Sequence, residues 1–175
     1  MNEVKMGLSN QRSMGASADL DDAFATRMGV HYPTGFAVIA LTDERTQSQF
    51  LQALTASGFE RPSFVSISTE QFRDYLRQTL NDAGMLAQIV ASEVKQSQIF
   101  LQLAEEGARF LFVRVADDKA RDTLIDVGLP LGSLKAVYYQ SLAIEELPFS
   151  RDVFPGPSPY GANETPRNKS SNASQ

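Results

Sequence analysis

The stretch Arg109-Phe-Leu-Phe-Val-Arg-Val-Ala116 is the most strand-like part of the 175-residue chain. It is rich in β-branched and aromatic residues, a glycine closely precedes it, and two aspartates follow it. Side chains alternate across a strand, so Phe110 and Phe112 share one face, and Leu111 and Val113 share the other. A sheet with one solvated face would carry polar residues on that face. The two phenylalanines therefore predict that both faces of this strand are covered.

Three further strands are predicted along the chain. The run Phe36-Ala-Val-Ile-Ala-Leu41 is also apolar on both faces, which is typical of a central strand. Shorter strands are expected over residues 61–68 and 136–143, where apolar residues cluster between turn-forming ones.

Helical periods connect these strands. Asp43 and Asp117 each precede such a period and are expected to cap the first turn of a helix. The first helix should end near Ser57, and the second near Val127, before a loop over 128–132. Between the two strand–helix–strand halves, residues 69–106 show helical periods and form an insert too long for a hairpin connection.

This order predicts an α+β, ferredoxin-like fold. Two β–α–β halves with right-handed crossovers build a four-stranded antiparallel sheet backed by two helices, here with the helical insert between strands 2 and 3. The strands at 36–41 and 109–116 should be central. An all-parallel doubly wound sheet is the alternative, although four strands are few for it and no glycine-rich phosphate loop occurs.

The composition divides the chain into three parts. Residues 33–147 are predicted to form the domain, whereas 1–32 and 148–175 lack a sustained apolar period and are expected to be a disordered arm and a disordered tail. His31, the only histidine, ends the arm and is expected to be solvated. Three aromatic residues of the tail are candidate docking anchors, although such residues are more often neutral: Phe149, Phe154 and Tyr160.

Charge and composition argue against several classes of function. The net charge is −5, and residues 33–147 carry ten basic and fifteen acidic side chains, which disfavours a nucleic-acid surface. The absence of cysteine excludes disulfides and thiolate zinc sites, and a single histidine predicts no metal site. No apolar run reaches the length of a signal peptide or a membrane span, so a cytoplasmic protein without membrane contact is expected.

No catalytic signature is present. The adjacent acidic pairs, such as Asp43-Glu44 and Asp117-Asp118, are better explained as helix starts or exposed strand flanks than as paired catalytic carboxylates. Hydroxyl side chains have no histidine partner within a motif, and no phosphate-binding or dinucleotide-binding glycine pattern occurs. We therefore predict that the protein is not an enzyme and carries no cofactor.

Several of these motifs together resemble an uncharacterised bacterial family related to the heat-induced general stress protein domain. The similarity covers about residues 35–147 and rests on four passages, which are Gly35–Leu41, Leu54–Phe59, Glu105–Val115 and Val137-Tyr-Tyr139 with Ile144-Glu-Glu-Leu147. The family has no agreed activity. The resemblance implies the ferredoxin-like unit, a bacterial origin and an association with stress.

The leading functional hypothesis is a non-catalytic interaction or sensory module. Its predicted interaction face is the side of the sheet away from the two crossover helices, formed by Phe36, Val38, Phe64, Phe110, Phe112 and Tyr138. Either the insert at 69–106 or a second copy of the chain would cover this face.

Three other functions stay open. A small-ligand-binding regulatory domain would have its pocket at the junction of sheet and insert. A single-stranded RNA-binding module would stack bases on Phe110 and Phe112. Catalysis is the last alternative.

Overall fold

The computed structural model describes residues 23–27, 29–61, 63–82 and 91–151. Its centre is a five-stranded antiparallel sheet in the order β4-β5-β3-β6-β7. The strands of this sheet are β3 (Phe36–Leu41), β4 (Phe64–Ile67), β5 (Arg109–Arg114), β6 (Lys135–Tyr139) and β7 (Ile144–Glu146). A separate hairpin precedes it in the chain and consists of β1 (Thr26–Arg27) and β2 (Val30–His31).

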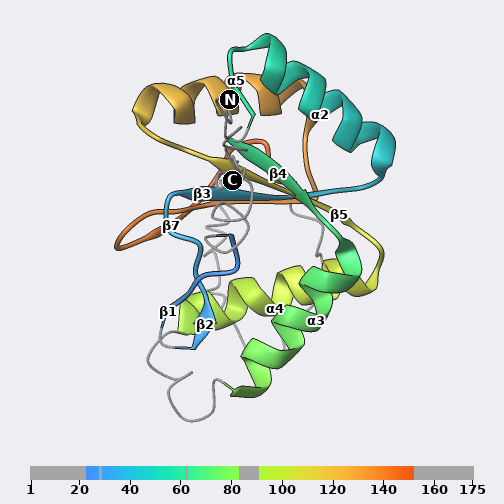
Figure 1. Cartoon of the computed structure of the whole chain (residues 1–175), viewed down its shortest axis with the longest axis vertical. Coiled ribbons are helices and arrows are strands. Elements are labelled where there is room, and N and C mark those ends of the chain that lie inside the picture. The colour runs from blue at the N-terminus through green and yellow to red at the C-terminus, as the bar shows by residue number, and fades with distance from the viewer. Residues whose placement is uncertain (1–22, 28, 62, 83–90, 152–175) are drawn as a thin grey trace, which may run out of the picture.

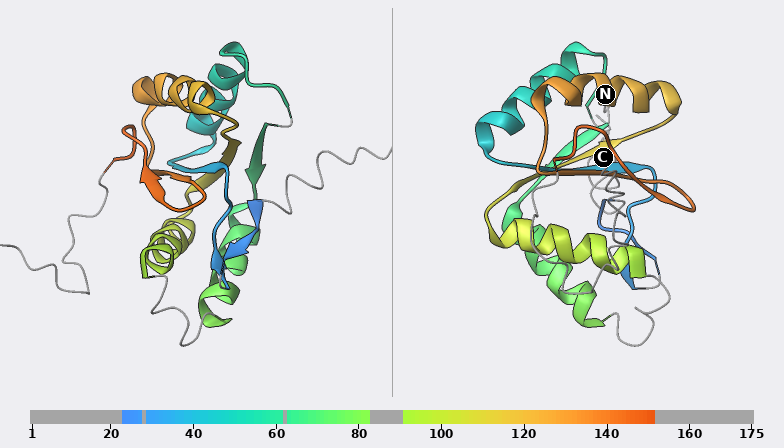
Figure 2. Two further views of the ribbon diagram at one scale, coloured as in Figure 1. Left: turned by 90° about the vertical axis from the view of Figure 1, so that its left-hand side faces the viewer. Right: turned by 180° about the vertical axis from the view of Figure 1, so that it is seen from behind.

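Helices cover both faces of the sheet (Figures 1 and 2). Helices α2 (Glu44–Ala56) and α5 (Asp118–Leu131) lie on one face, and α3 (Thr69–Asp82) and α4 (Ala91–Glu105) lie on the other. The sheet is therefore the middle layer of three. The predicted α+β class with an antiparallel sheet is confirmed, but the sheet has five strands where four were predicted.

Strands β3 and β5 carry the core, as their two apolar faces predict. All six residues of β3 are buried, and Val38 pairs directly with Phe112 of β5. Residues opposite one another in an antiparallel pair share a face. Each strand therefore contributes side chains to two hydrophobic cores, one under each helical layer.

The helix starts follow the predicted capping. The carboxylate of Asp43 accepts a hydrogen bond from the backbone N–H of Thr46 at 2.8 Å, and Asp117 accepts one from Ala120 at the same distance. These bonds satisfy N–H groups that have no partner within the helix. They also explain the acidic pairs at these positions as helix starts. At the other end of α4, Gly107 adopts φ 89°, which reverses the chain into β5.

Helix α5 is longer than predicted and includes Pro130. A proline has no N–H to donate to a helical hydrogen bond. In the last turn of a helix the missing N–H costs one hydrogen bond and does not interrupt the rest of the helix. Gly132, with φ 69°, ends the helix, and its N–H donates to the carbonyl of Gly128 at 2.7 Å. The loop predicted over 128–132 is therefore mostly the last turn of α5.

The described structure extends beyond the predicted domain at both ends. The hairpin β1–β2 falls within the predicted disordered arm. At the other end, Phe149 is buried between the sheet and its helices, with its ring centroid 5.9 Å from that of Phe50. Residues 1–22 of the arm, and residues 152–175 with Phe154 and Tyr160, lie outside the described part of the chain.

Candidate functional site

The predicted interaction face is largely covered by the chain's own insert. Phe36, Val38, Phe110 and Phe112 lie on the face opposite the crossover helices, as predicted, and each is at most 1% exposed. The ring of Phe72, from α3, has its centroid 4.7 Å from that of Phe110 and 5.3 Å from that of Phe112. These rings are therefore unavailable to stack an RNA base or to meet the sheet of a second copy.

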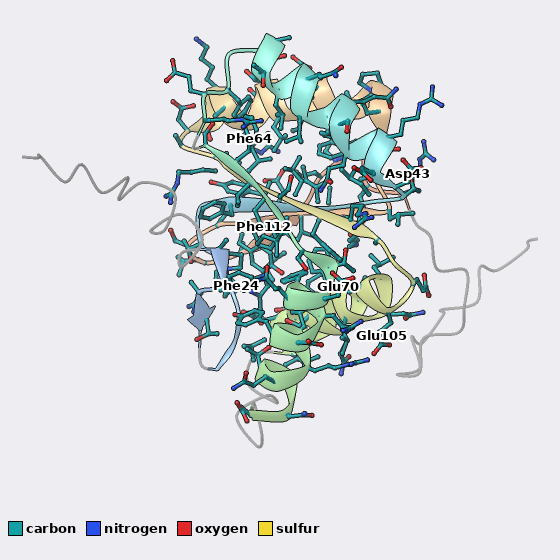
Figure 3. All side chains as sticks on the ribbon, turned by 45° about the vertical axis from the view of Figure 1, so that its right-hand side comes forward. Phe24, Asp43, Phe64, Glu70, Glu105 and Phe112 are labelled. Carbon is teal, nitrogen blue, oxygen red and sulfur yellow. The ribbon has the colours of Figure 1, made fainter. Side chains whose placement is uncertain are left out.

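Phe64 and Tyr138 lie on the opposite face, contrary to the prediction (Figure 3 labels Phe64 and Phe112). The register explains both placements. Phe64 pairs with Val113, and Tyr138 pairs with Ala37, so each shares a face with a residue packed under α2 and α5. Alternation shows which residues of one strand share a face. Which face of the neighbouring strand they share depends on the pairing register, which alternation does not determine.

His31 is buried, contrary to the expected solvated position. It is 0% exposed and is surrounded by aromatic side chains of α3, β5 and β6. Its ring centroid is 5.2 Å from Phe72, 5.3 Å from Tyr75 and 5.7 Å from Tyr139. Burial lowers the pKa of His31 to about 3, so the imidazole is neutral at physiological pH.

The hydrogen bonds of Tyr75 assign the tautomer of this imidazole. The hydroxyl of Tyr75 has one proton, which it donates to the carbonyl of Phe24 at 2.7 Å. Nδ1 of His31, 3.2 Å from the same hydroxyl, must therefore be the donor in their hydrogen bond. Nε2 then carries a lone pair and can only accept.

This lone pair belongs to a set of buried polar atoms that have no hydrogen-bond partner among the described residues. The others in the same region of the core are the hydroxyl of Tyr139 and the hydroxyl of Ser97, from α4. Burial raises the pKa of Tyr139, and the nearby Glu93 carboxylate adds to this effect. The junction of sheet, insert and hairpin thus contains neutral polar groups in an otherwise apolar core.

A pocket of about 480 Å³ lies on the outer side of the same hairpin. It is lined by Ala25, Thr26, Arg27, Tyr32, Thr34 and Ser141. Its inner wall is Tyr32, which is 2% exposed and whose ring centroid is 5.1 Å from that of the buried Tyr139. Tyr32 therefore lines the pocket and also packs against one of the buried polar side chains.

Arg27 is the cation of this pocket and is held in place from two sides. Its guanidinium lies over the ring of Tyr32, 5.2 Å from the centroid, and its Nη1 donates to the carbonyl of Ser141 at 3.0 Å. The hydroxyl of Tyr32 in turn donates to the carbonyl of Gln140 at 2.7 Å. Among the residues that the structure describes, no carboxylate forms an ion pair with Arg27.

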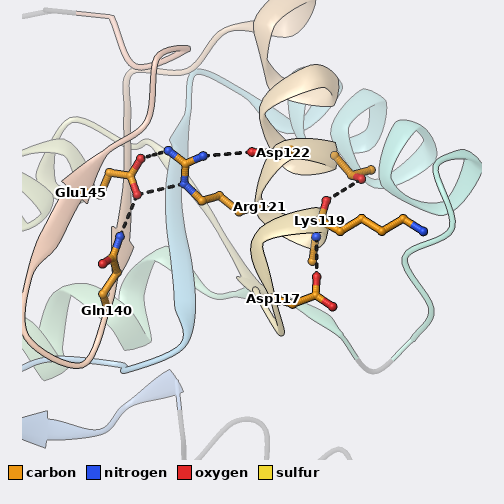
Figure 4. Close-up of polar contacts among 8 residues, drawn as sticks. Asp117, Lys119, Arg121, Asp122, Gln140 and Glu145 are labelled. Atoms are coloured by element: carbon orange, nitrogen blue, oxygen red, sulfur yellow. Dashed lines mark hydrogen bonds and ion pairs between the residues drawn. The ribbon is translucent and has the colours of Figure 1, made fainter.

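The turn between β6 and β7, which carries Ser141, is fastened to α5 by a polar network (Figure 4). Nε of Arg121 donates to Glu145 at 3.0 Å, and Nη2 of Arg121 donates to the second oxygen of the same carboxylate. The side-chain amide of Gln140 donates to Glu145 at 2.8 Å. The guanidinium of Arg121 lowers the pKa of Glu145, and the network fixes the edge strand β7 relative to the helix.

Sequence reasoning missed Arg27 and Tyr32 because both lie in the predicted disordered arm. The only local signal is Gly29, which has φ 81° and separates the two short strands of the hairpin. Within the described ranges, no group of three acidic, histidine or cysteine side chains could hold a metal ion. No helix among these residues is long and apolar enough to cross a membrane.

No protein-family model, curated protein or solved structure matches the chain. The resemblance to the heat-induced general stress protein domain therefore stays a prediction from the sequence motifs.

Proposed function

We propose that the protein is a non-catalytic regulatory domain that binds a small molecule in the pocket beside the hairpin β1–β2. The proposal chooses the ligand-binding alternative over a docking face on the sheet. Both faces of the sheet are covered by the chain's own helices, so neither face is free for a partner. The pocket, in contrast, opens to the surface where the hairpin meets the β6–β7 turn.

The observation that carries the proposal is the state of Arg27. An exposed arginine usually samples many rotamers, and binding a ligand must overcome that entropy. Here the guanidinium is already held by Tyr32 and by the carbonyl of Ser141, yet it has no acidic partner in the described part of the chain. A side chain that is ordered but unsatisfied by an anion is suited to ligand binding.

The fold context supports a regulatory role. The strand order β6-β3-β5-β4, with α2 and α5 on one face, is consistent with the expected ferredoxin-like unit, to which β7 adds a fifth strand. The groups best suited to acid–base chemistry, the imidazole of His31 and the hydroxyl of Tyr139, are both 0% exposed. Neither is among the described residues that line the pocket, which favours binding over catalysis. The association with stress in a bacterial cytoplasm remains part of this proposal on the resemblance alone.

Nuclear magnetic resonance tests this function on the full chain. A fragment library is added to uniformly ¹⁵N-labelled protein, and bound compounds are expected to shift the amide signals of Thr26, Arg27, Thr34 and Ser141. The Ser141→Trp variant places a large ring in the pocket lining while keeping the backbone carbonyl that Arg27 uses. It should abolish these shifts.

The matched control is Leu142→Trp. Leu142 follows Ser141, is 88% exposed, and does not line the pocket, so the same ring at this position should leave ligand binding unchanged. The proposal is wrong if no compound shifts the pocket signals, or if both tryptophan variants bind ligands as the native chain does.

A further inference from the structure

We infer that the pocket recognises the carboxylate of a small organic acid, with Arg27 as the residue that binds it. This inference rests on the proposed function and specifies the chemical class of its ligand. It begins with the guanidinium of Arg27, which forms no ion pair with a carboxylate of the described residues. Nη1 of Arg27 donates to the carbonyl of Ser141, and the plane of the group lies over Tyr32.

Any guanidinium has two parallel N–H groups along the edge formed by Nε and Nη2. These two donors match the two oxygens of a carboxylate, which can accept both bonds in one plane. Since the contacts to Tyr32 and Ser141 already orient the side chain, little further entropy is lost when the anion binds. A lysine at this position would supply the charge without the two-pronged geometry.

The charge in the pocket favours a single negative charge on the ligand. Among the described residues of the lining, Arg27 is the only side chain with a formal charge. The carboxylate of Glu93 acts on the hydroxyl of Tyr32 from nearby and helps to raise its pKa, although burial is the larger cause and Arg27 opposes the shift. A doubly charged phosphate would carry one negative charge more than Arg27 neutralises, whereas the single charge of a carboxylate is neutralised by Arg27 alone.

The rest of the lining indicates the body of the ligand. Ala25 offers apolar contact, and Thr26 and Thr34 bring hydroxyl groups. A volume of about 480 Å³ lies within the range of small-molecule sites. An aromatic or short aliphatic monocarboxylate fits these features.

The experiment compares sodium benzoate with benzamide, which has nearly the same shape and no charge. Each is titrated into the full-length ¹⁵N-labelled chain at constant ionic strength, and the amide signals of Arg27, Thr34 and Ser141 report binding. Sodium phosphate is titrated as a third probe. A charged hydrogen-bonded pair is worth about a tenfold to hundredfold change in affinity, so benzoate should bind at least about tenfold more tightly than benzamide and phosphate.

Three variants separate the contribution of Arg27 from that of net charge. Arg27→Gln should weaken benzoate binding by about tenfold or more and remove its advantage over benzamide. Arg27→Lys keeps the charge but not the two parallel donors, so most of the advantage should also be lost. Arg45→Gln is the matched control, because Arg45 is an exposed residue of α2, on the other side of the sheet, and its loss changes the net charge equally.

The outcomes distinguish this inference from the function on which it rests. Benzamide that binds as tightly as benzoate at the pocket signals would overturn the carboxylate and leave the ligand-binding function intact. Tighter binding of phosphate would overturn the preference for a single charge. An Arg45→Gln variant that loses benzoate as Arg27→Gln does would refute the local role of Arg27. If the fragment library also leaves the pocket signals unchanged, the proposed function itself fails.

Discussion

The burial of His31 predicts that the protein loses stability in mildly acidic solution. The imidazole has a pKa near 6.5 in an unfolded chain and a pKa of about 3 in the folded one. A group whose pKa is lowered by folding stabilises the fold above its unfolded pKa, and this stabilisation is lost as the pH falls toward the folded pKa. The loss therefore begins near pH 6.5 and continues toward pH 3.

The magnitude follows from the two pKa values. Between pH 7.5 and pH 5.5, the free energy of unfolding should fall by about 1.4 kcal/mol, or about 3 to 6 °C in Tm. This value depends very little on the folded pKa as long as it lies well below 5.5. The Arg121 guanidinium lowers the pKa of Glu145, so that this carboxylate stays charged throughout the range. The interval also stays above the isoelectric point of about 4.9, where solubility is lowest.

The assay is urea unfolding at the two pH values, followed by far-UV circular dichroism. The chain has only one histidine, so His31→Gln removes the only side chain with an unperturbed pKa in this interval. Glutamine can still donate a hydrogen bond to Tyr75, and His31→Phe serves as an apolar second variant. Any contribution from the chain terminus is common to all three proteins and cancels. A native chain with equal stability at both pH values, or a variant that keeps the native pH dependence, would refute the reasoning.

Three further changes test the packing. Replacing Phe110 and Phe112 together by Ser should unfold the chain, because each truncation costs about 3 to 5 kcal/mol and the free energy of unfolding of a whole domain is about 5 to 15 kcal/mol. A native circular dichroism spectrum would contradict this. Gly128→Ala would place a Cβ within 2.5 Å of the Phe149 ring and should lower the free energy of unfolding by about 1 to 3 kcal/mol, measured by urea unfolding. In a chain that also carries Phe149→Ala, the same substitution should have no such effect. Arg121→Gln should speed amide hydrogen exchange in β7 and leave exchange in β3 unchanged; equal rates in the native chain and the variant would exclude the fastening of the edge strand.

The central elements of the fold could be predicted because their signals are local. The apolar run at 36–41 and the stretch at 109–116 have the composition of covered strands. Asp43 and Asp117 stand where a carboxylate can reach the first free N–H groups of a helix. The two phenylalanines of β5 also predict correctly that a further layer covers the sheet, since their face lies beneath α3 and α4.

The misplaced and missed residues depend on contacts between distant parts of the chain. The faces of Phe64 and Tyr138 follow from pairing register, which the pattern within one strand does not contain. The position of Tyr32 depends on the backbone carbonyl of Gln140, 108 residues away, and a carbonyl acceptor has no residue type that a sequence could reveal. The candidate pocket could therefore not be predicted, and its described lining contains no residue of the insert at 69–106, where the sequence placed a possible ligand site.

The hairpin β1–β2 closes a core whose buried polar groups include some without a hydrogen-bond partner in the described part of the chain, and this links its stability to the pocket. The lone pair of His31 and the hydroxyls of Tyr139 and Ser97 each cost about 1 to 3 kcal/mol when buried without a partner. The bonds from Tyr32 to Gln140 and from Arg27 to Ser141 lie on the outer side of the hairpin and oppose that cost.

The two residues that fasten the hairpin therefore also line the pocket. A ligand that binds them only in the closed arrangement stabilises the hairpin by the free energy of its own binding, because binding to one state shifts the equilibrium toward that state. Under the proposed function, such a ligand would therefore stabilise the hairpin and with it the burial of His31. A regulatory domain needs such a coupling between a bound ligand and a change elsewhere in its structure.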